Sequence, residues 1–148
     1  MPASIRVLIV DDEALMRAGI RLMVDGAVVD GATISVVGEA SDGAAALAEV
    51  ARLDPDVVLM DVRMPRMTGI DAVRELTARG ERARIVMLTA FDTDEFLLDA
   101  LRAGAISFLL KDSAPQSVLG AIAEAAAGRP RISPTALARL ISLATAQG

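Results

Sequence analysis

The stretch VVLMDVRMP, residues 57–65, decides the fold of this chain because an apolar run in it ends on an aspartate. Short apolar runs rich in valine are typical of a strand buried on both faces, as in a parallel sheet. A carboxylate at the end of such a strand costs free energy unless a partner pairs with it or a reaction uses it. Asp61 is therefore the first candidate for a functional residue.

Four further apolar runs have the same character, namely Ile5–Val10, Ile34–Val37, Ile85–Leu88 and Ile106–Leu110. Helical periodicity follows each of the five runs, over about 15–24, 44–53, 70–78, 95–103 and 118–127. Asp54-Pro55, Gly80 and Gly104 lie where these segments need turns or helix caps. We predict an α/β fold, flavodoxin-like and doubly wound, with a five-stranded parallel sheet of order 2-1-3-4-5.

Residues 129–148 depart from this alternation of strand and helix. The segment SPTALARLISLATAQ, 133–147, predicts a sixth helix with Ser133 at its N-cap and Pro134 at its first position. We expect one domain over 1–128. Residues 129–148 are expected to form a linker helix that packs on this domain or leads to another.

Composition limits the possible functions. A chain of 148 residues with 53% hydrophobic and 24% charged residues is expected to fold as one soluble domain, neither disordered nor membrane-bound. The N-terminus has no secretory signal pattern, so we expect a cytoplasmic protein. The absence of cysteine and histidine excludes disulfides and thiolate zinc sites. A net charge of −5 without a basic run argues against direct nucleic-acid binding.

Acidic residues end two strands that the predicted order makes neighbours. Asp11 and Asp12 follow the first strand, and Asp61 follows the third, so all three are expected at the switch point of the sheet. Carboxylates about 4 Å apart repel by roughly 4 kcal/mol at an effective dielectric of 20. An all-oxygen site favours Mg²⁺, with Mn²⁺ as the alternative.

Two more polar residues end the fourth and fifth strands. Thr89 and Lys111 are expected at the same sheet edge as the acids. Together the edge would hold a nucleophilic carboxylate, a metal, a hydroxyl and an ammonium group. Such a set stabilises a phosphoryl group during transfer.

The motifs resemble those of the receiver domain of two-component response regulators. The matching segments are VLIVDDE (7–13), VVLMDVRMPRMTGID (57–71), VMLTA (86–90) and GAISFLLKD (104–112), in the order of that family. The resemblance covers residues 5 to about 127. It implies that Asp61 accepts a phosphoryl group from the phosphohistidine of a sensor histidine kinase, or from a small acyl phosphate.

The resemblance also implies the ligands of the metal. Asp12 and Asp61 would bind Mg²⁺ directly, the backbone carbonyl of Arg63 would be the third protein ligand, and Asp11 would act through water. The side chain of Arg63 would border the phosphoryl group and affect its lifetime.

Three further residues have roles implied by the resemblance. Lys111 would pair with Asp61 and then with the phosphoryl oxygens. Thr89 would donate a hydrogen bond to another phosphoryl oxygen, and Phe108 would rotate inward as Thr89 moves. The protein would regulate rather than turn over a substrate, although it would catalyse its own phosphorylation and dephosphorylation.

Each of these residues also has a structural interpretation. Asp12 could cap the first helix, and Thr89 could cap the fourth helix or fill the core. Phe108 could be an ordinary core residue, and Lys111 an ordinary solvated lysine. Pro65 and Gly69 are expected only to shape the loop after Asp61.

The segment GRPRISPTALARLI, 128–141, resembles the connector of NarL-type regulators, in which a helix-turn-helix domain follows. We expect the receiver portion of a transcription regulator that dimerises on phosphorylation, with any contact to DNA made through that absent domain. A stand-alone receiver is the alternative. More remote are a phosphohydrolase of the haloacid dehalogenase kind, which places Asp-x-Asp after the first strand, and a flavodoxin-like binder, which needs a hydroxyl-rich phosphate loop there.

Overall fold

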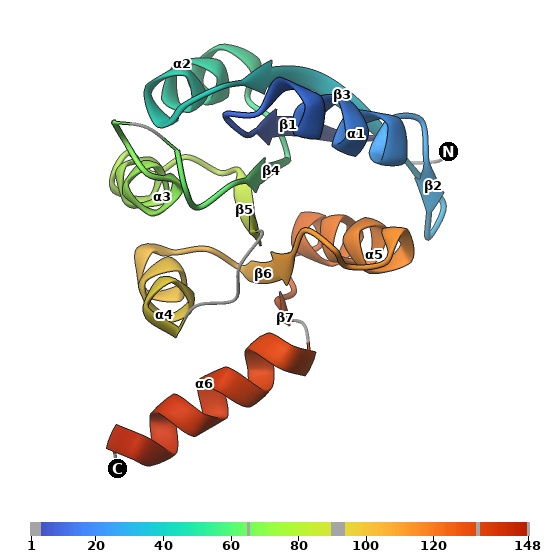
Figure 1. Ribbon diagram of the computed structural model, residues 1–148. Helices are drawn as coiled ribbons and strands as arrows, with labels where there is room; N and C mark the ends of the chain where they lie inside the picture. Colours follow the sequence, from blue (N-terminus) through green and yellow to red (C-terminus); the bar gives the residue numbers. More distant parts are fainter. Residues whose placement is uncertain (1–3, 65, 90–93, 133, 148) are drawn as a thin grey trace.

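A single mixed sheet organises the chain. The computed structural model describes residues 4–64, 66–89, 94–132 and 134–147. Within these ranges the sheet has the strand order β2-β3-β1-β4-β5-β6-β7 (Figure 1). The strands are β1 (Ser4–Val10), β2 (Val28–Val29), β3 (Ala32–Ala40), β4 (Val57–Met60), β5 (Arg84–Thr89), β6 (Ser107–Leu110) and β7 (Arg131–Ile132).

The predicted order of the five inner strands is confirmed, because β3, β1, β4, β5 and β6 are adjacent and parallel. The prediction of a five-stranded sheet was wrong, since the described residues include two further strands. β2 pairs antiparallel with β3 across Asp30-Gly31, where both φ angles are positive, as a tight two-residue hairpin requires. β7 pairs parallel with β6. β2 and β7 have two residues each, too few to show a hydrophobic period in the sequence.

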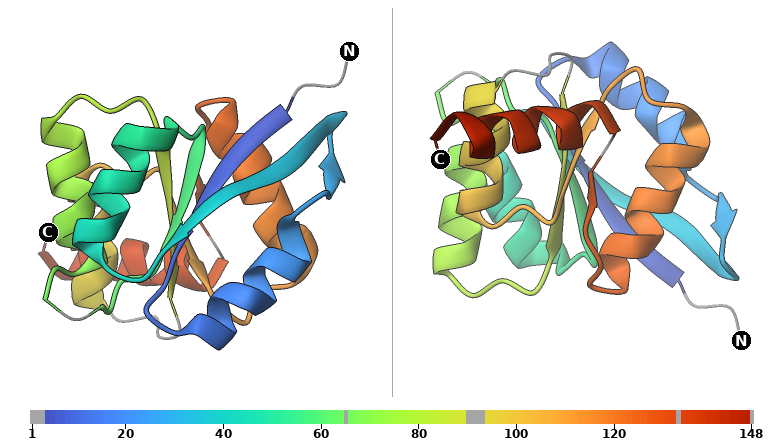
Figure 2. Two further views of the ribbon diagram at one scale, coloured as in Figure 1. Left: turned by 90° about the horizontal axis from the view of Figure 1, so that it is seen from above. Right: turned by 90° about the horizontal axis from the view of Figure 1, so that it is seen from below.

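Helices cover both faces of the sheet. They are α1 (Ala14–Val24), α2 (Gly43–Leu53), α3 (Gly69–Ala78), α4 (Asp94–Ala103), α5 (Pro115–Ala126) and α6 (Pro134–Gln147). Figure 2 shows α1 and α5 on one face and α2, α3 and α4 on the other. The core is accordingly divided in two. Ile20 and Ile122 pack with one side of the strands, and Val50 and Val73 with the other.

Local signals explain where several helices begin and end. The side chains of Asp42 and Thr68 accept hydrogen bonds from Ala45 N and Asp71 N, which caps α2 and α3. Gly104 follows α4 with φ +119°, and the amide of Ala105 bonds back to Ala100 O at 3.0 Å. This is the glycine C-cap predicted there. Helix α5 begins at Pro115, earlier than the predicted residue 118, with proline in its first turn.

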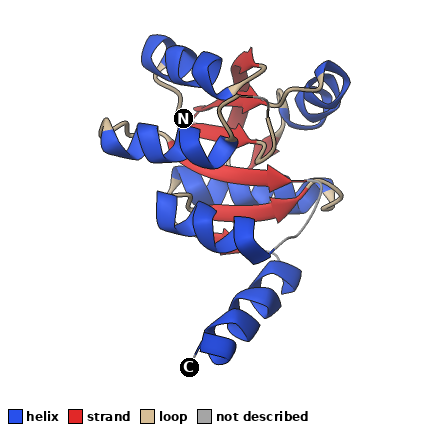
Figure 3. Ribbon diagram, turned by 60° about the vertical axis from the view of Figure 1, so that its left-hand side comes forward, coloured by secondary structure: helices blue, strands red, loops and turns tan. Residues whose placement is uncertain are grey.

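The C-terminal segment adds a strand and a helix to the domain. α6 begins at Pro134 as predicted, while Ser133, its predicted N-cap, lies outside the described residues. α6 is the helix nearest the label C in Figure 3. It contacts α4, and its partly buried Leu140 packs on the core. No helix in the described part of the chain is long and apolar enough to cross a membrane.

Candidate phosphoryl-transfer and metal site

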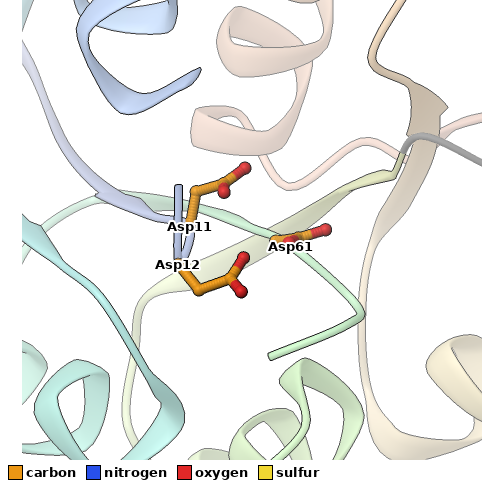
Figure 4. A group of neighbouring side chains, drawn as sticks. All are labelled: Asp11, Asp12 and Asp61. Atoms are coloured by element: carbon orange, nitrogen blue, oxygen red, sulfur yellow. The ribbon is translucent and has the colours of Figure 1, made fainter. Parts of the chain in front are cut away.

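The acidic residues meet because backbone hydrogen bonds extend the sheet beyond the ends of its strands. Asp11 N donates to Ala40 O at 3.1 Å, and Asp61 N donates to Val10 O at 2.9 Å. Figure 4 shows the side chains of Asp11, Asp12 and Asp61 turned toward one common space. One carboxylate oxygen of each lies within 4.8 Å of those of the other two. Asp11 and Asp61 are buried, whereas Asp12 is exposed.

Lys111 reaches this cluster from the end of β6. Its amide donates to Thr89 O at 2.7 Å, which ties the ends of β5 and β6 together. Its Nζ lies 2.6 Å from Asp11 Oδ2 and 3.4 Å from Asp61 Oδ1, and the side chain is only 8% exposed. The solvated-lysine interpretation is thereby excluded. The pairing with Asp61 exists, but the contact with Asp11 is shorter.

Burial and neighbouring charges shift the pKa values of Asp61 and Lys111. Burial raises the pKa of Asp61 from 3.8 to about 6; the ammonium of Lys111 opposes this rise, and the carboxylates of Asp11 and Asp12 add to it. Burial alone would lower the pKa of Lys111, but hydrogen bonding and attraction to Asp11 and Asp61 outweigh burial and raise it. At neutral pH Asp61 is therefore mostly an anion and Lys111 a cation.

The oxygens of Asp11 provide a test of whether a cation fits here. Oδ1 accepts a hydrogen bond from Glu13 N at 2.9 Å. Oδ2 is buried, and its polar partner in the described part of the chain is Lys111 Nζ at 2.6 Å. A carboxylate oxygen has two lone pairs and can accept from a second partner. The cluster of three carboxylates around one ammonium retains net negative charge, so a hard divalent cation or its bound water fits this donor set.

The capping alternative is not supported for Asp12. α1 begins at Ala14 with Glu13 at the N-cap, and the side chain of Glu13 makes no capping hydrogen bond. Asp12 therefore points toward the cluster without holding the helix (Figure 4). Thr89 is the last residue of β5 and is buried, and residues 90–93, which link it to α4, lie outside the described residues, so its capping alternative stays a prediction.

Thr89 and Phe108 lie on one face of the sheet. Phe108 is fully buried and paired in register with Met87, two residues before Thr89, so strand alternation places all three side chains on the same face. Phe108 packs in the core with Met60 and Met87. This packing satisfies the core interpretation and also places the ring on the face to which Thr89 belongs.

The loop between β4 and α3 holds the remaining residues. The side chain of Arg63 is exposed, and Pro65 lies outside the described residues. Gly69 N donates to Val62 O at 2.9 Å, and a Cβ on Gly69 would overlap the carbonyl oxygen of Asp61. The prediction that Gly69 shapes this loop is confirmed, for a definite steric reason.

One residue beside the site has no signal in the sequence. Arg17, on α1, donates from Nη1 to the backbone oxygen of Asp11 at 2.7 Å and from Nε to Glu39 Oε1 at 3.1 Å. An arginine in an amphipathic helix ordinarily indicates a solvated face. Its contact with the acidic turn depends on the distance between α1 and β3, which periodicity does not report.

Comparison with known proteins agrees with this geometry. The family model described as "Response regulator receiver domain" matches residues 7–123. The chain belongs to that family. This receiver is 39% identical over 139 residues to the uncharacterized transcriptional regulatory protein YxjL of Bacillus subtilis, covering 94% of this chain and 62% of YxjL. It spans about three fifths of the length of the curated relatives it matches.

Solved structures show the same fold. The signal receiver domain of the putative response regulator NarL from Mycobacterium tuberculosis aligns with a TM-score of 0.79 and 37% identity, over 86% of this receiver and 100% of that chain. A LuxR-family two-component response regulator from Aurantimonas aligns with a TM-score of 0.88 and 30% identity, over 97% and 99% of the two chains. The chain is thus a receiver domain of a two-component response regulator.

Proposed function

We propose that Asp61 is the phosphoacceptor of this receiver. The observation that carries the proposal is the burial of Asp61 within ion-pair distance of Lys111 and beside two further carboxylates. A carboxylate oxygen of Asp61 attacks phosphorus and forms the acyl phosphate, while the bond from phosphorus to the donor's leaving group breaks. The donor is the phosphohistidine of a sensor histidine kinase or a small acyl phosphate.

Mg²⁺ is the proposed cofactor, with Mn²⁺ as a substitute. Asp12 and Asp61 would hold the ion directly together with the backbone carbonyl of Arg63, and Asp11 would act through bound water. When bound, the ion supplies positive charge that offsets the phosphoryl oxygens and the carboxylates. The three neighbouring carboxylates, whose charge one ammonium does not balance, support this assignment.

Lys111 and Thr89 would stabilise the charge of the phosphoryl group, and Phe108 would respond to it. Lys111 would move its ion pairing from the carboxylates to the phosphoryl oxygens, and Thr89 would donate a hydrogen bond to another of them. Phe108 lies on the same sheet face as Thr89 and would follow its displacement. The receiver catalyses its own phosphorylation and dephosphorylation and regulates a partner without turning over a substrate.

Intact mass spectrometry after incubation with acetyl phosphate tests the proposal. We expect a single phosphoryl adduct that requires Mg²⁺ and is lost in Asp61→Asn. Asp71→Asn is the matched control, because Asp71 is an exposed acid on α3 paired only with Arg74 among the described residues. An adduct that survives in Asp61→Asn, or needs no Mg²⁺, would contradict the assignment.

For the output we propose a cytoplasmic transcriptional regulator that dimerises on phosphorylation. Residues 1–128 would be the receiver and 129–148 the linker toward a helix-turn-helix domain, so these residues would not contact DNA or membranes themselves. Similarity to transcriptional regulatory proteins supports this, and a stand-alone receiver is the alternative. Sedimentation before and after phosphorylation tests dimerisation: an unchanged dimer fraction over the full concentration range would contradict it.

A further inference from the structure

Arg17 connects the acidic turn after β1 to the end of β3. Its guanidinium donates from Nη1 to the backbone oxygen of Asp11 at 2.7 Å and from Nε to Glu39 Oε1 at 3.1 Å. The side chain is only 19% exposed. A planar guanidinium holds two acceptors in a fixed relative orientation, which a flexible ammonium cannot do. The two contacts therefore clamp the turn against a strand.

The carbonyl that Arg17 holds belongs to the peptide between Asp11 and Asp12. Because a peptide unit is planar, fixing this oxygen also fixes the direction in which the Asp12 backbone leaves. The amide on the other side of Asp11 donates to Ala40 O at 3.1 Å. Ala40 is adjacent to Glu39, so both polar contacts attach the turn to the same end of β3. Asp12 itself is exposed and depends on this backbone for its position.

Glu39 makes the clamp compatible with a cation site. It accepts from Arg17 at 3.1 Å through Oε1 and from Arg21 Nη1 at 2.7 Å through Oε2. Its negative charge offsets part of the positive charge of Arg17, so the guanidinium beside the site competes less with a bound cation. Arg21 is more exposed, at 44%, and within the described residues its guanidinium bonds only to Glu39.

We infer that Arg17 is a positioning residue for the proposed Mg²⁺ site, because it orients the Asp11–Asp12 peptide from which two of its carboxylates project. This inference rests on the proposed function. Residues that orient the ligands of a metal ordinarily change its affinity about 10- to 100-fold when they are removed. Arg17 contacts the backbone oxygen of Asp11 and the side chain of Glu39, and within the described residues it makes no contact with the carboxylate of Asp61.

Three variants of the full chain separate positioning from general stability. Arg17→Ala removes both contacts, yet leaves Glu39 paired with Arg21. Arg17→Lys keeps the positive charge but loses the planar guanidinium that holds both acceptors in a fixed orientation. Arg21→Ala is the matched control, because it removes a salt bridge to the same Glu39 and leaves the Asp11 contact intact. The primary measurement is the dissociation constant of Mg²⁺ by calorimetric titration without a phosphoryl donor. The thermal midpoint in EDTA is measured in parallel.

We expect Arg17→Ala to weaken Mg²⁺ binding about 10-fold. Arg17→Lys should recover part of this loss, and Arg21→Ala should bind Mg²⁺ like the wild type. A weakened affinity shared by Arg21→Ala, or a lowered thermal midpoint with unchanged affinity in Arg17→Ala, would overturn the inference. Phosphorylation of the wild type is scored separately: its failure would refute the proposed function, whereas the Mg²⁺ titrations would still decide the role of Arg17.

Discussion

Lys111 Nζ lies closer to Asp11 than to Asp61, at 2.6 Å against 3.4 Å. The buried ammonium is thus paired mainly with the carboxylate that we do not propose as the nucleophile. In this arrangement Lys111 compensates the charge of Asp11 while remaining near enough to meet a phosphoryl group on Asp61. The pairing suggests that Lys111 stabilises the fold as well as the chemistry, and the two roles can be measured separately.

Replacing Lys111 by methionine should destabilise the protein without metal. The change leaves Asp11 and Asp61 buried without their cation, a loss on the order of 3–5 kcal/mol in the free energy of unfolding. Saturating Mg²⁺ should recover a larger share in the variant than in the wild type, because the ion replaces the missing charge. Urea unfolding with EDTA or Mg²⁺ measures both. Equal destabilisation under the two conditions would contradict this account.

Asp61→Asn should stabilise the metal-free protein at neutral pH. The folded state holds the Asp61 proton more tightly than the unfolded chain, since the pKa is raised from 3.8 to about 6. Tighter proton binding by the folded state therefore contributes to the free energy of unfolding below about pH 4, and this contribution is lost as the pH rises through about 6. The variant should gain at most about 2–3 kcal/mol above pH 6 and little below pH 4. Urea unfolding in EDTA across this range measures it.

The control for that titration is Asp71→Asn, whose side chain is half exposed. Its difference from the wild type should not follow the same pH window. If Asp61→Asn raised the free energy of unfolding by the same amount at pH 4 and pH 7, the destabilising ionisation would not belong to Asp61.

Gly69→Ala should damage both stability and phosphorylation. The new methyl would overlap the carbonyl oxygen of Asp61, so α3 or the loop must shift, at a cost of about 1–3 kcal/mol. Gly19→Ala is the matched control, because its Cβ meets nothing within 4 Å on α1. There, alanine should stabilise by up to about 1 kcal/mol through helix propensity. Chemical unfolding and the acetyl phosphate reaction measure the pair; similar behaviour of the two variants would contradict the steric explanation.

The attachment of α6 should depend on Leu140 and not on its neighbour Ile141. Leu140 is partly buried against the core, whereas Ile141 is 57% exposed. Leu140→Ala should lower the local opening free energy of α6 by about 1 kcal/mol, in proportion to the lost apolar burial. Amide hydrogen exchange of residues 134–147 reports this. Equal acceleration by Ile141→Ala would show that α6 is held in another way.

Much of this receiver follows from local pattern. The apolar runs and the helical periods between them predict five parallel strands, and right-handed crossovers place helices on both faces of the sheet. The strand order is that of the flavodoxin-like, doubly wound fold. That order alone brings Asp11, Asp12 and Asp61 to one sheet edge with Thr89 and Lys111, because the carboxyl ends of parallel strands coincide. The two-residue strands β2 and β7 escaped prediction because they carry no period, although Asp30-Gly31 was a usable hairpin signal.

Only the tertiary structure decided which of these groups interact and how strongly. The shorter contact of Lys111 with Asp11, the raised pKa of Asp61 and the clamp by Arg17 depend on burial and on differences of less than 1 Å in the distances between side chains. Coulomb and hydrogen-bond energies change steeply over such distances, whereas hydrophobic periodicity does not encode them. The sequence by itself determined which residues gather at the sheet edge, and the packing of α1 and β6 against it determined their partners.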